Sequence, residues 1–450
     1  MPRFTDQYGA LYDRLYSRWA VVIKTDSGYS PASHARYADR AVSAGELPVI
    51  TPRNRKGLGD FRTNAFEPDL DDLTISYITV NIRINDFLCS KPERQEGVIP
   101  FVYNGKEYYA DRTKISEYDA IMRSAHQRNI IVSAIILVYP EHSSKDRATG
   151  RILEHPEYET SGAYSMPNMT TPESLNLYAA GIDFLALRYS RSDALSGHIH
   201  RWIVHNEIDA GAVWTSAGRK DIYSYMDIYM KSLRLVYLTA LKYNKNAEVF
   251  VPFTHFWKDR FNDECYAPSD MLEILLLYSR KEGDFRWGIA YHAYPADLIE
   301  PKSWLDNNVT SDFQTPLITF KNLEVLNEWA KQPDTFYQNR EPRKVMLSEQ
   351  NPNSRDYSER ELNEQTACLA YAWKKMQACS QIEAYIAHSW IDAHFEGGLK
   401  TGLRKYPDDP SGRKPAWYVF SSLGTDREDG ACEFAKKIIG INEWKEIYNR

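Results

Sequence analysis

Several familiar sequence signals are missing from this chain of 450 residues. It has only five cysteines, they lie far apart, and no Cys-x-x-Cys pair occurs, so neither a zinc ribbon nor a dithiol redox motif is present. We expect reduced thiols in a cytoplasmic protein. The N-terminus has no basic segment followed by an apolar one, as a signal peptide would have, although a secreted protein whose signal had been removed would look the same.

Excess positive charge and long apolar runs are also lacking. Lys and Arg number 55 against 61 Asp and Glu, a formal net charge of −6, which gives no electrostatic footprint for nucleic acid. No apolar run approaches the ~18 residues that span a bilayer. No Gly-x-Gly-x-x-Gly follows a strand-like run, and no Gly-x-x-x-x-Gly-Lys-Ser/Thr occurs. We therefore expect no nucleic acid, membrane or cofactor as a partner, and the oligomeric state stays open.

The composition is otherwise that of an ordinary globular chain, with one bias. Hydrophobic residues make up 43% and charged residues 26%, whereas tyrosine (31) outnumbers phenylalanine (17), and 11 tryptophans are present. Tyr and Trp offer an apolar face with a polar tip, which suits ligands such as sugars. A large tyrosine-rich core explains the same bias equally well.

Short β-branched runs recur along the chain, separated by longer stretches of mixed polarity. Their near-continuous hydrophobicity is typical of parallel strands buried on both faces. An earlier strand is expected near 18–24 or 47–51, which brings the count to about eight. The clearest runs are 74–84, 129–139, 201–208, 247–253, 286–294, 344–350 and 382–390.

Between these runs lie amphipathic stretches with helical spacing. Such alternation predicts either a (β/α)₈ barrel or a doubly wound sheet, and the missing nucleotide motifs weigh against the second. We therefore predict an α/β fold, a (β/α)₈ TIM barrel with long βα loops. It forms a single domain over 1–450, with its core at about 18–424 and extensions at both ends. The clearest helix-like stretches are 114–128, 224–243, 268–283 and 358–377.

Polar residues cluster where the predicted strands end. In a (β/α)₈ barrel the C-terminal strand ends and the loops after them form the active face. Chemically useful groups at seven successive strand ends are therefore unlike a chance pattern. They include Arg83, Asn206, Glu207, His255, His292, Glu349, His388 and Trp390.

Two of these residues are carboxylates that close apolar strands. Glu207 ends the run WIVHNE and Glu349 ends VMLSE, with two strand candidates between them. If Glu207 closes the fourth strand, then Glu349 closes the seventh, roughly across an eight-stranded barrel. A lone Glu at a strand end is more often a solvated loop residue, so the prediction rests on the relation between the two.

This arrangement resembles clan A of the retaining glycoside hydrolases. The resemblance covers roughly residues 74–424, and it makes Glu207 the acid/base and Glu349 the nucleophile. It implies that Asn206 contacts a sugar hydroxyl and that Arg83 supports the nucleophile. It also implies that Tyr294, in His292-Ala293-Tyr294, hydrogen-bonds the nucleophile and that Trp390 lies under the sugar.

Other interpretations of these residues remain. His292, His388 and His255 are expected to contact sugar hydroxyls rather than a metal, and no metal site is expected. Trp214, in the loop after the fourth strand, is a stacking platform or a buried loop anchor. The expected substrate is an oligo- or polysaccharide with an equatorial (β-type) linkage or its L-sugar equivalent. The alternative is a non-catalytic carbohydrate-binding barrel or a barrel enzyme of other chemistry.

The loops carry further acidic residues. We expect most of these to be solvated, and one or two to hydrogen-bond sugar hydroxyls. They are Glu141, Asp209, Glu264, Asp392 and Glu396.

Overall fold

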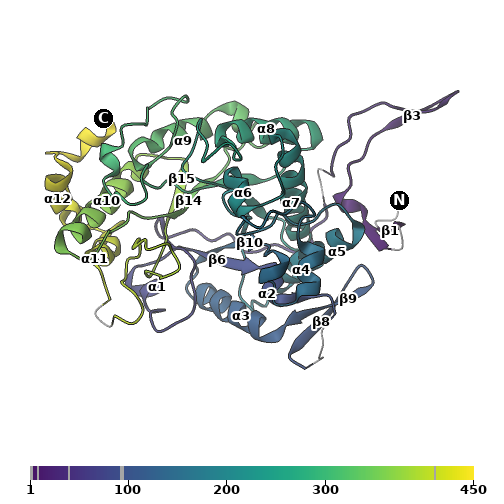
Figure 1. The fold of residues 1–450 in the computed structure, drawn as a ribbon, viewed down its shortest axis with the longest axis horizontal. Coiled ribbons are helices and arrows are strands. Elements are labelled where there is room, and N and C mark those ends of the chain that lie inside the picture. The colour runs from purple at the N-terminus through teal and green to yellow at the C-terminus, as the bar shows by residue number, and fades with distance from the viewer. Residues whose placement is uncertain (1–3, 8–9, 39–40, 92–95, 410–411, 450) are drawn as a thin grey trace.

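A computed structural model of the chain describes residues 4–7, 10–38, 41–91, 96–409 and 412–449. Its centre is a closed barrel of eight parallel strands, so the predicted fold class is confirmed (Figure 1). In barrel order the strands are β5 (Lys56–Leu58), β6 (Tyr77–Arg83), β10 (Ile131–Leu137), β11 (Arg201–Val204), β12 (Glu248–Phe253), β13 (Trp287–Tyr291), β14 (Val345–Gln350) and β15 (Ile382–Ala387).

Helices follow the strands and surround the barrel (Figure 1). Four of the longest, α3, α5, α7 and α10, begin after a Ser, Thr or Asp whose side chain accepts a backbone N–H of the first turn. The helices are α1 (Asp69–Asp72), α2 (Ile84–Phe87), α3 (Arg112–Gln127), α4 (Arg147–Leu153), α5 (Pro172–Arg188), α6 (Gly211–Trp214), α7 (Ile222–Tyr243), α8 (Pro268–Glu282), α9 (Leu323–Ala330), α10 (Glu359–Gln377), α11 (Pro415–Ser422) and α12 (Glu428–Ile439). None of these described helices is long and apolar enough to cross a membrane.

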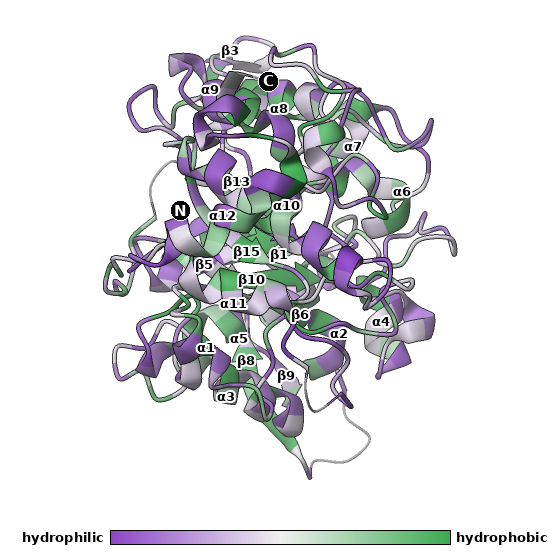
Figure 2. Cartoon of the chain, turned by 90° about the vertical axis from the view of Figure 1, so that its left-hand side faces the viewer, coloured by the Kyte–Doolittle hydropathy of each residue, from purple (hydrophilic) through white to green (hydrophobic). Residues whose placement is uncertain are grey.

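Apolar side chains from the barrel strands pack in two layers, because successive residues of a strand point to opposite faces. One set fills the barrel interior, with Ile135, Ile203, Phe250 and Ala290 among its members. The other set lies between the strands and the helices and forms the larger cluster. Figure 2 shows the resulting hydrophobic centre, with polar residues on the outer helices. The interior is therefore a packed core that supports whatever lies at its ends.

The expected position of the first strand is wrong. The run 18–24 contributes to an antiparallel hairpin outside the barrel, and 47–51 is not a strand. The first barrel strand is β5, which has only three residues and places a lysine and a glycine beside one leucine. Such a strand has no hydrophobic run to detect, whereas 18–24 has the composition of a strand but exposes it to solvent.

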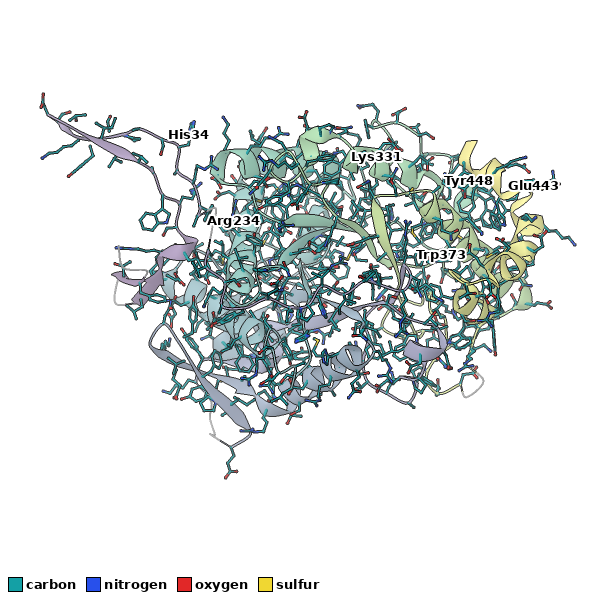
Figure 3. All side chains as sticks on the ribbon, turned by 180° about the vertical axis from the view of Figure 1, so that it is seen from behind. His34, Arg234, Lys331, Trp373, Glu443 and Tyr448 are labelled. Carbon is teal, nitrogen blue, oxygen red and sulfur yellow. The ribbon has the colours of Figure 1, made fainter. Side chains whose placement is uncertain are left out.

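Among the described residues, three small antiparallel sheets lie outside the barrel. The hairpin of β3 (Val22–Thr25) and β4 (Gly28–Pro31) is exposed at every residue and stands away from the body of the molecule (Figures 1 and 3). Near it, β1 (Phe4–Gln7) pairs with β2 (Ala10–Asp13). The third sheet joins β7 (Leu88–Cys89), β9 (Lys106–Asp111) and β8 (Val98–Tyr103) in the loop after β6.

Candidate active site

The strand-end residues lie at one end of the barrel, as parallel strands require. Ala290 belongs to the interior cluster, so His292, two residues later, continues the same face beyond the end of β13. His388 stands in the same relation to Ile386 of β15. Arg83 is the last residue of β6. Simple alternation thus brings these side chains together above the core.

Glu349 reaches this end of the barrel by a different route. Met346 belongs to the interior cluster, so regular alternation would turn Ser348 inward and Glu349 outward. The pairing of β14 with β15 shifts register between Leu347 and Gln350. An irregularity of this kind re-aims side chains next to active sites, and here it turns Glu349 toward its partners.

Glu207 lies on a tight turn directly after β11. His205 and Glu207 both adopt left-handed backbone, with φ values of 72° and 34°. The imidazole of His205 is buried and hydrogen-bonds the Ser232 hydroxyl at 2.9 Å, which anchors the turn to α7. Left-handed non-glycine residues cost energy and cluster at functional sites. The strained turn presents Glu207 at the mouth of the barrel.

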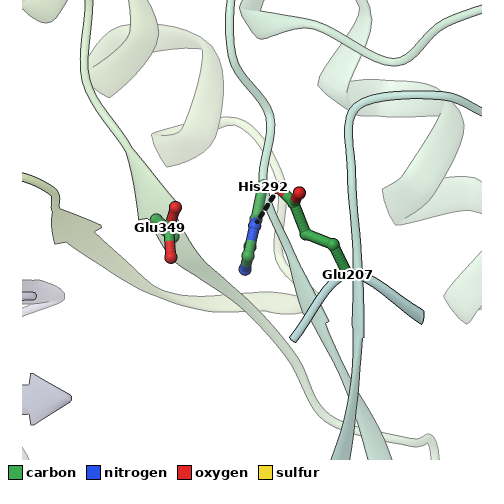
Figure 4. A group of neighbouring side chains, drawn as sticks. All are labelled: Glu207, His292 and Glu349. Atoms are coloured by element: carbon green, nitrogen blue, oxygen red, sulfur yellow. Dashed lines mark hydrogen bonds and ion pairs between the residues drawn. The ribbon is translucent and has the colours of Figure 1, made fainter. Parts of the chain in front are cut away.

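Glu207, His292 and Glu349 form a compact cluster (Figure 4). His292 Nδ1 lies 2.8 Å from Glu207 Oε1, and one ligand atom of each of the three side chains lies within 4.8 Å of the others. One oxygen of Glu207 and one oxygen of Glu349 therefore lie no more than 4.8 Å apart, with the His292 imidazole beside them (Figure 4). The same donor set could also hold a divalent cation.

The two carboxylates have different surroundings. Burial raises the pKa of Glu207 to about 7, and the Trp214 indole and the charge of His388 only partly oppose this rise. Burial also lowers the pKa of His292, which keeps its imidazole neutral near pH 7. Glu207 can therefore hold a proton near neutral pH, as a general acid must.

Glu349 faces hydrogen-bond donors and a cation. The Tyr294 hydroxyl donates to Glu349 Oε1 at 3.4 Å, which places Tyr294 where the resemblance expects it. His388 Nε2 lies 3.9 Å from the same oxygen and 3.7 Å from Glu396 Oε1. Burial lowers the pKa of His388, but Glu349, Glu396 and Asp60 outweigh it and raise the pKa to about 9. The imidazole is therefore charged at neutral pH.

Arg83 does not make the contact that the resemblance implies. Its guanidinium lies over the Tyr139 ring, 5.0 Å from the centroid, and 3.7 Å from the Asp86 carboxylate. Within the described part of the chain it forms no ion pair with Glu349. Its position at the end of β6 matches the expectation, whereas its support of the nucleophile stays a prediction without a direct contact.

Three aromatic rings form a row beside Glu207. Tyr139 stacks on Tyr164 with centroids 5.5 Å apart and an interplanar angle of 17°, and Tyr164 lies 5.9 Å from Trp214. All three side chains are half-buried. Trp214 thus ends a row of rings that pack on one another, and Tyr164 was not among the residues expected from the sequence.

The remaining expected residues lie in varied places. His255 is half-buried, and burial together with neighbouring His292 lowers its pKa to about 4. Asn206 is half-buried directly before Glu207. Trp390 is 3% exposed, stacks on Phe61 and donates its indole N–H to Asp69 at 2.9 Å. The Trp390 ring is thus largely engaged by the protein itself.

Two of the acidic loop residues, Asp209 and Asp392, are buried, whereas most residues of this group were expected to be solvated. Asp209 is 1% exposed and accepts hydrogen bonds from the backbone and the hydroxyl of Thr254; burial raises its pKa to about 7. Asp392 is fully buried and pairs with Lys414 at 2.8 Å. Each ties a loop at the active end to a neighbouring element. The partner of each carboxylate lies far away in the sequence, so no local sequence pattern predicts that the carboxylate is buried and paired.

Two further acidic residues at this end are Asp60, which was not expected from the sequence, and Glu396. They line a cavity of about 240 Å³ between the loops that follow β5 and β15, with Arg62 and Trp390 also in its wall. Asp60 could not be recognised because β5 itself was not. Glu396 was expected only as a loop residue.

Comparisons with known proteins locate the chain among relatives. A model of the "Family of unknown function (DUF5722)" matches residues 48–447. The chain belongs to this family. No curated protein matches its sequence.

A solved structure of a glycoside hydrolase shares the barrel fold of this chain. A family 39 glycoside hydrolase from the gut symbiont Bacteroides cellulosilyticus WH2 is 13% identical, with a TM-score of 0.52 over 93% of this chain and 70% of that one. The exo-beta-1,4-mannosidase Op5Man5 from Opitutaceae bacterium strain TAV5 is 12% identical, with a TM-score of 0.48 over 85% of this chain and 60% of that one. A GH39 beta-xylosidase from Caulobacter crescentus is 16% identical, with a TM-score of 0.48 over 84% of this chain and 73% of that one. At such low identity, the likeness to the family 39 enzyme shows a shared barrel fold only. The chemistry has to be argued from the residues of the site.

Proposed function

We propose that this protein is a retaining glycoside hydrolase that cleaves an equatorial (β-type) glycosidic bond of an oligo- or polysaccharide. Glu207 is the acid/base and Glu349 the nucleophile. The observation that carries the proposal is the approach of two carboxylates within 4.8 Å, at the ends of the fourth and seventh barrel strands. Retaining enzymes hold their carboxyl groups ~5 Å apart, whereas inverting enzymes need ~6.5–9.5 Å to admit a water molecule.

The reaction takes two displacements. Glu349 attacks the anomeric carbon while Glu207 gives its proton to the leaving oxygen, so the glycosidic bond breaks as an ester bond to Glu349 forms. Glu207, now a carboxylate, then takes a proton from water, and the hydroxide displaces Glu349 from the sugar. Two inversions give net retention, and both carboxyl groups return to their starting states.

The surroundings of the two carboxylates support this division of roles. Burial holds the proton on Glu207 up to about pH 7. Glu349 accepts a hydrogen bond from the Tyr294 hydroxyl and lies 3.9 Å from the charged His388. The raised pKa of Glu207 supports the role of acid for Glu207 and the role of nucleophile for Glu349.

A screen of aryl β-glycosides and plant polysaccharides tests the proposal. We expect turnover of at least one aryl β-glycoside, with the β-anomer as the first product by proton NMR. Glu207→Gln and Glu349→Gln should each lower the rate, whereas Glu341→Gln, which removes an exposed carboxylate paired with Arg286, should not. An inverted product, or full activity in either active-site variant, would contradict the proposal.

The cluster of Glu207, His292 and Glu349 also favours a second candidate, a metal-assisted hydrolase. Two carboxylates and an imidazole are suitable ligands for a divalent cation. The discriminating measurement is activity after treatment with EDTA, followed by addition of Mn²⁺ or Zn²⁺. A glycosidase of the proposed type keeps its activity in EDTA, whereas loss in EDTA and recovery with metal would favour the second candidate. Sugar binding without turnover would instead indicate a carbohydrate-binding barrel.

A further inference from the structure

We infer that a cavity beside Glu349 binds one further sugar unit of the substrate, on the side away from the leaving group. The cavity, of about 240 Å³, lies between the loops that follow β5 and β15. The substrate is then an oligosaccharide with at least two sugar units on the side of the bond that becomes attached to Glu349. This inference rests on the proposed function and extends it from the bond that is cleaved to the length of chain that is recognised.

The cavity lies across the barrel from Glu207 and next to Glu349. Glu207 follows β11, and β15 is four strands from β11 in either direction around the closed barrel, whereas Glu349 belongs to the neighbouring strand β14. Glu396 lines the cavity, and its Oε1 lies 3.7 Å from His388 Nε2, which is 3.9 Å from Glu349 Oε1. The His388 imidazole therefore links the cavity wall to Glu349.

The roles of the two carboxylates give the substrate a direction. Glu207 protonates the leaving oxygen, so the leaving group lies against the end of β11. The sugar ring that becomes attached to Glu349 extends away from that group, toward the opposite side of the barrel. A second sugar joined to the far end of this ring reaches the loops after β15 and β5, where the cavity lies.

An exposed aromatic ring lines the cavity. Phe395, in the loop after β15, is 72% exposed, which is high for a phenylalanine in a cavity wall. An aromatic ring offers a flat apolar face, and the face of a sugar ring is also apolar. Phe395 thus supplies a surface on which a sugar unit can pack.

The same wall holds polar groups with unused hydrogen-bonding capacity. Asp60 accepts from Asn81 at 3.1 Å and from Arg62 at 2.6 Å, which fixes one edge of the guanidinium. In the described part of the chain, the other N–H groups of Arg62 have no hydrogen-bond partner. Asn64 accepts the Phe66 N–H at 2.7 Å through its carbonyl oxygen, and its amide N–H groups have no partner among the described residues. Both side chains can donate to sugar hydroxyls.

The size and charge of the cavity indicate a single neutral sugar unit. Its volume is below the roughly 300–1,000 Å³ of pockets for drug-sized ligands. The wall contains the carboxylates of Asp60 and Glu396 against the guanidinium of Arg62, and the carboxylate of Asp392 is paired with Lys414. An anionic sugar would meet charge of its own sign there. Neutral sugars are therefore the appropriate probes.

Aryl glycosides of two lengths test the inference. The probes are para-nitrophenyl β-xyloside, β-glucoside and β-mannoside, with any further aryl β-glycoside that the screen finds, each compared with the β-bioside of the same sugar. We expect kcat/KM for a bioside to exceed that for its monoside by about 10-fold or more, because contacts remote from the bond support catalysis at the bond. Chromatography should show the intact disaccharide as the sugar product.

Variants of the wall assign the effect to this cavity. Phe395→Ala removes the exposed ring and Arg62→Gln removes the guanidinium. Each should lower the ratio of the two kcat/KM values, bioside over monoside, by about threefold or more. Phe434→Ala is the matched control: it removes a ring that is 37% exposed on α12, and it should leave both values unchanged.

Three results would contradict the inference in different ways. Equal kcat/KM for every monoside and its bioside overturns the inference and leaves the glycosidase intact. A preference for biosides that neither Phe395→Ala nor Arg62→Gln reduces places the second sugar on another surface, so the assignment of this cavity is wrong. Absence of turnover over the whole screen, biosides included, overturns the proposed function and this inference with it.

Discussion

At the scale of single residues, burial of Glu207 determines its protonation state and therefore its role. The side chain is only 15% exposed, and His292 is its hydrogen-bond partner. A carboxylate placed there is destabilised relative to water, so the group keeps its proton to about pH 7. Glu349, within 4.8 Å, meets a hydroxyl and a cation instead. Two identical side chains thus have different neighbours.

Removal of Glu349 should separate nucleophilic attack from the rest of the reaction. Glu349→Ala leaves no nucleophile, so we expect turnover to be abolished. Azide or formate can enter the space and attack the anomeric carbon once, which should restore part of the rate with an inverted product. Proton NMR of the first product measures this. A retained product under azide would contradict the role of Glu349.

Removal of Glu207 should depend on the leaving group. Glu207→Ala takes away the proton donor, so substrates with poor leaving groups should slow far more than activated aryl glycosides. Azide should rescue this variant with retained configuration, because it attacks the glycosyl-enzyme where water lacks its base. A rate series over aryl glycosides of differing phenol acidity provides the measurement. Equal slowing of every substrate would contradict the acid role.

Burial of Glu207 should also appear in stability. Its pKa in the folded state, about 7, exceeds the ordinary 4.5, so stability is fully present below about pH 4.5 and is lost as pH rises through 7. The loss amounts to about 3 kcal/mol for this shift. Glu207→Gln cannot ionise, so its free energy of unfolding should gain on that of the wild-type protein between pH 5 and pH 8. Urea denaturation at both pH values measures the gain, and Glu341→Gln should show none.

At the scale of elements, regular strands were predictable and irregular ones were not. Seven barrel strands and the four amphipathic helices followed from hydrophobic pattern, because each buries a run or a stripe. The helix α5 was missed, since it is buried along nearly its whole length and has no polar stripe. The strand β5 was missed because it closes the barrel by pairing with two strands, one about 20 residues away and the other more than 300 residues away.

The residues of the candidate site also fall into those whose position the sequence predicts and those whose position it does not. His292 and His388 could be placed from alternation along β13 and β15. The inward turn of Glu349 depends on a register shift against β15, which its own strand does not encode. The direction of the Arg83 guanidinium depends on Tyr139 and Asp86, so its place at a strand end was predictable and its partners were not.

Closure of the barrel at β5 gives a prediction of its own. A Cβ on Gly57 would lie 2.8 Å from Ile386 Cγ1 and 2.9 Å from the Tyr77 carbonyl oxygen, so Gly57→Ala should overpack the interior. We expect a loss of about 1–3 kcal/mol in the free energy of unfolding. Gly430→Ala is the control: it lies in α12 with nothing within 4 Å of its Cβ, and it should be neutral or stabilising. An equal effect in both would show that the close approach at β5 has no energetic weight.

At the scale of the whole molecule, one closed barrel joins distant parts of the chain. β15 pairs with β5 across more than 300 residues, and β6 pairs with both β5 and β10. Each described strand of the barrel pairs with two neighbours, so loss of any one of them would open the barrel. The candidate site draws on residues from β6 to the loop after β15, so its geometry depends on that closure.

The single-domain organisation predicted from the sequence is best tested by limited proteolysis. Exposed backbone is cut first, and the β3–β4 hairpin is exposed along its whole length, with Val22 at 50%, Ile23 at 60% and Tyr29 at 72% exposure. We therefore expect early cleavage within residues 20–33, followed by a resistant fragment that contains the entire barrel. Mass spectrometry of the fragments locates the cuts, and activity should survive the first one, because no residue of the hairpin contributes to the candidate site.

Replacing residues 22–31 with a two-residue turn should remove this cut and change the unfolding midpoint little, since the excised residues bury almost nothing. Two stable fragments divided between β11 and β14 would mean that Glu207 and Glu349 belong to separate folding units, and one barrel would no longer describe the protein.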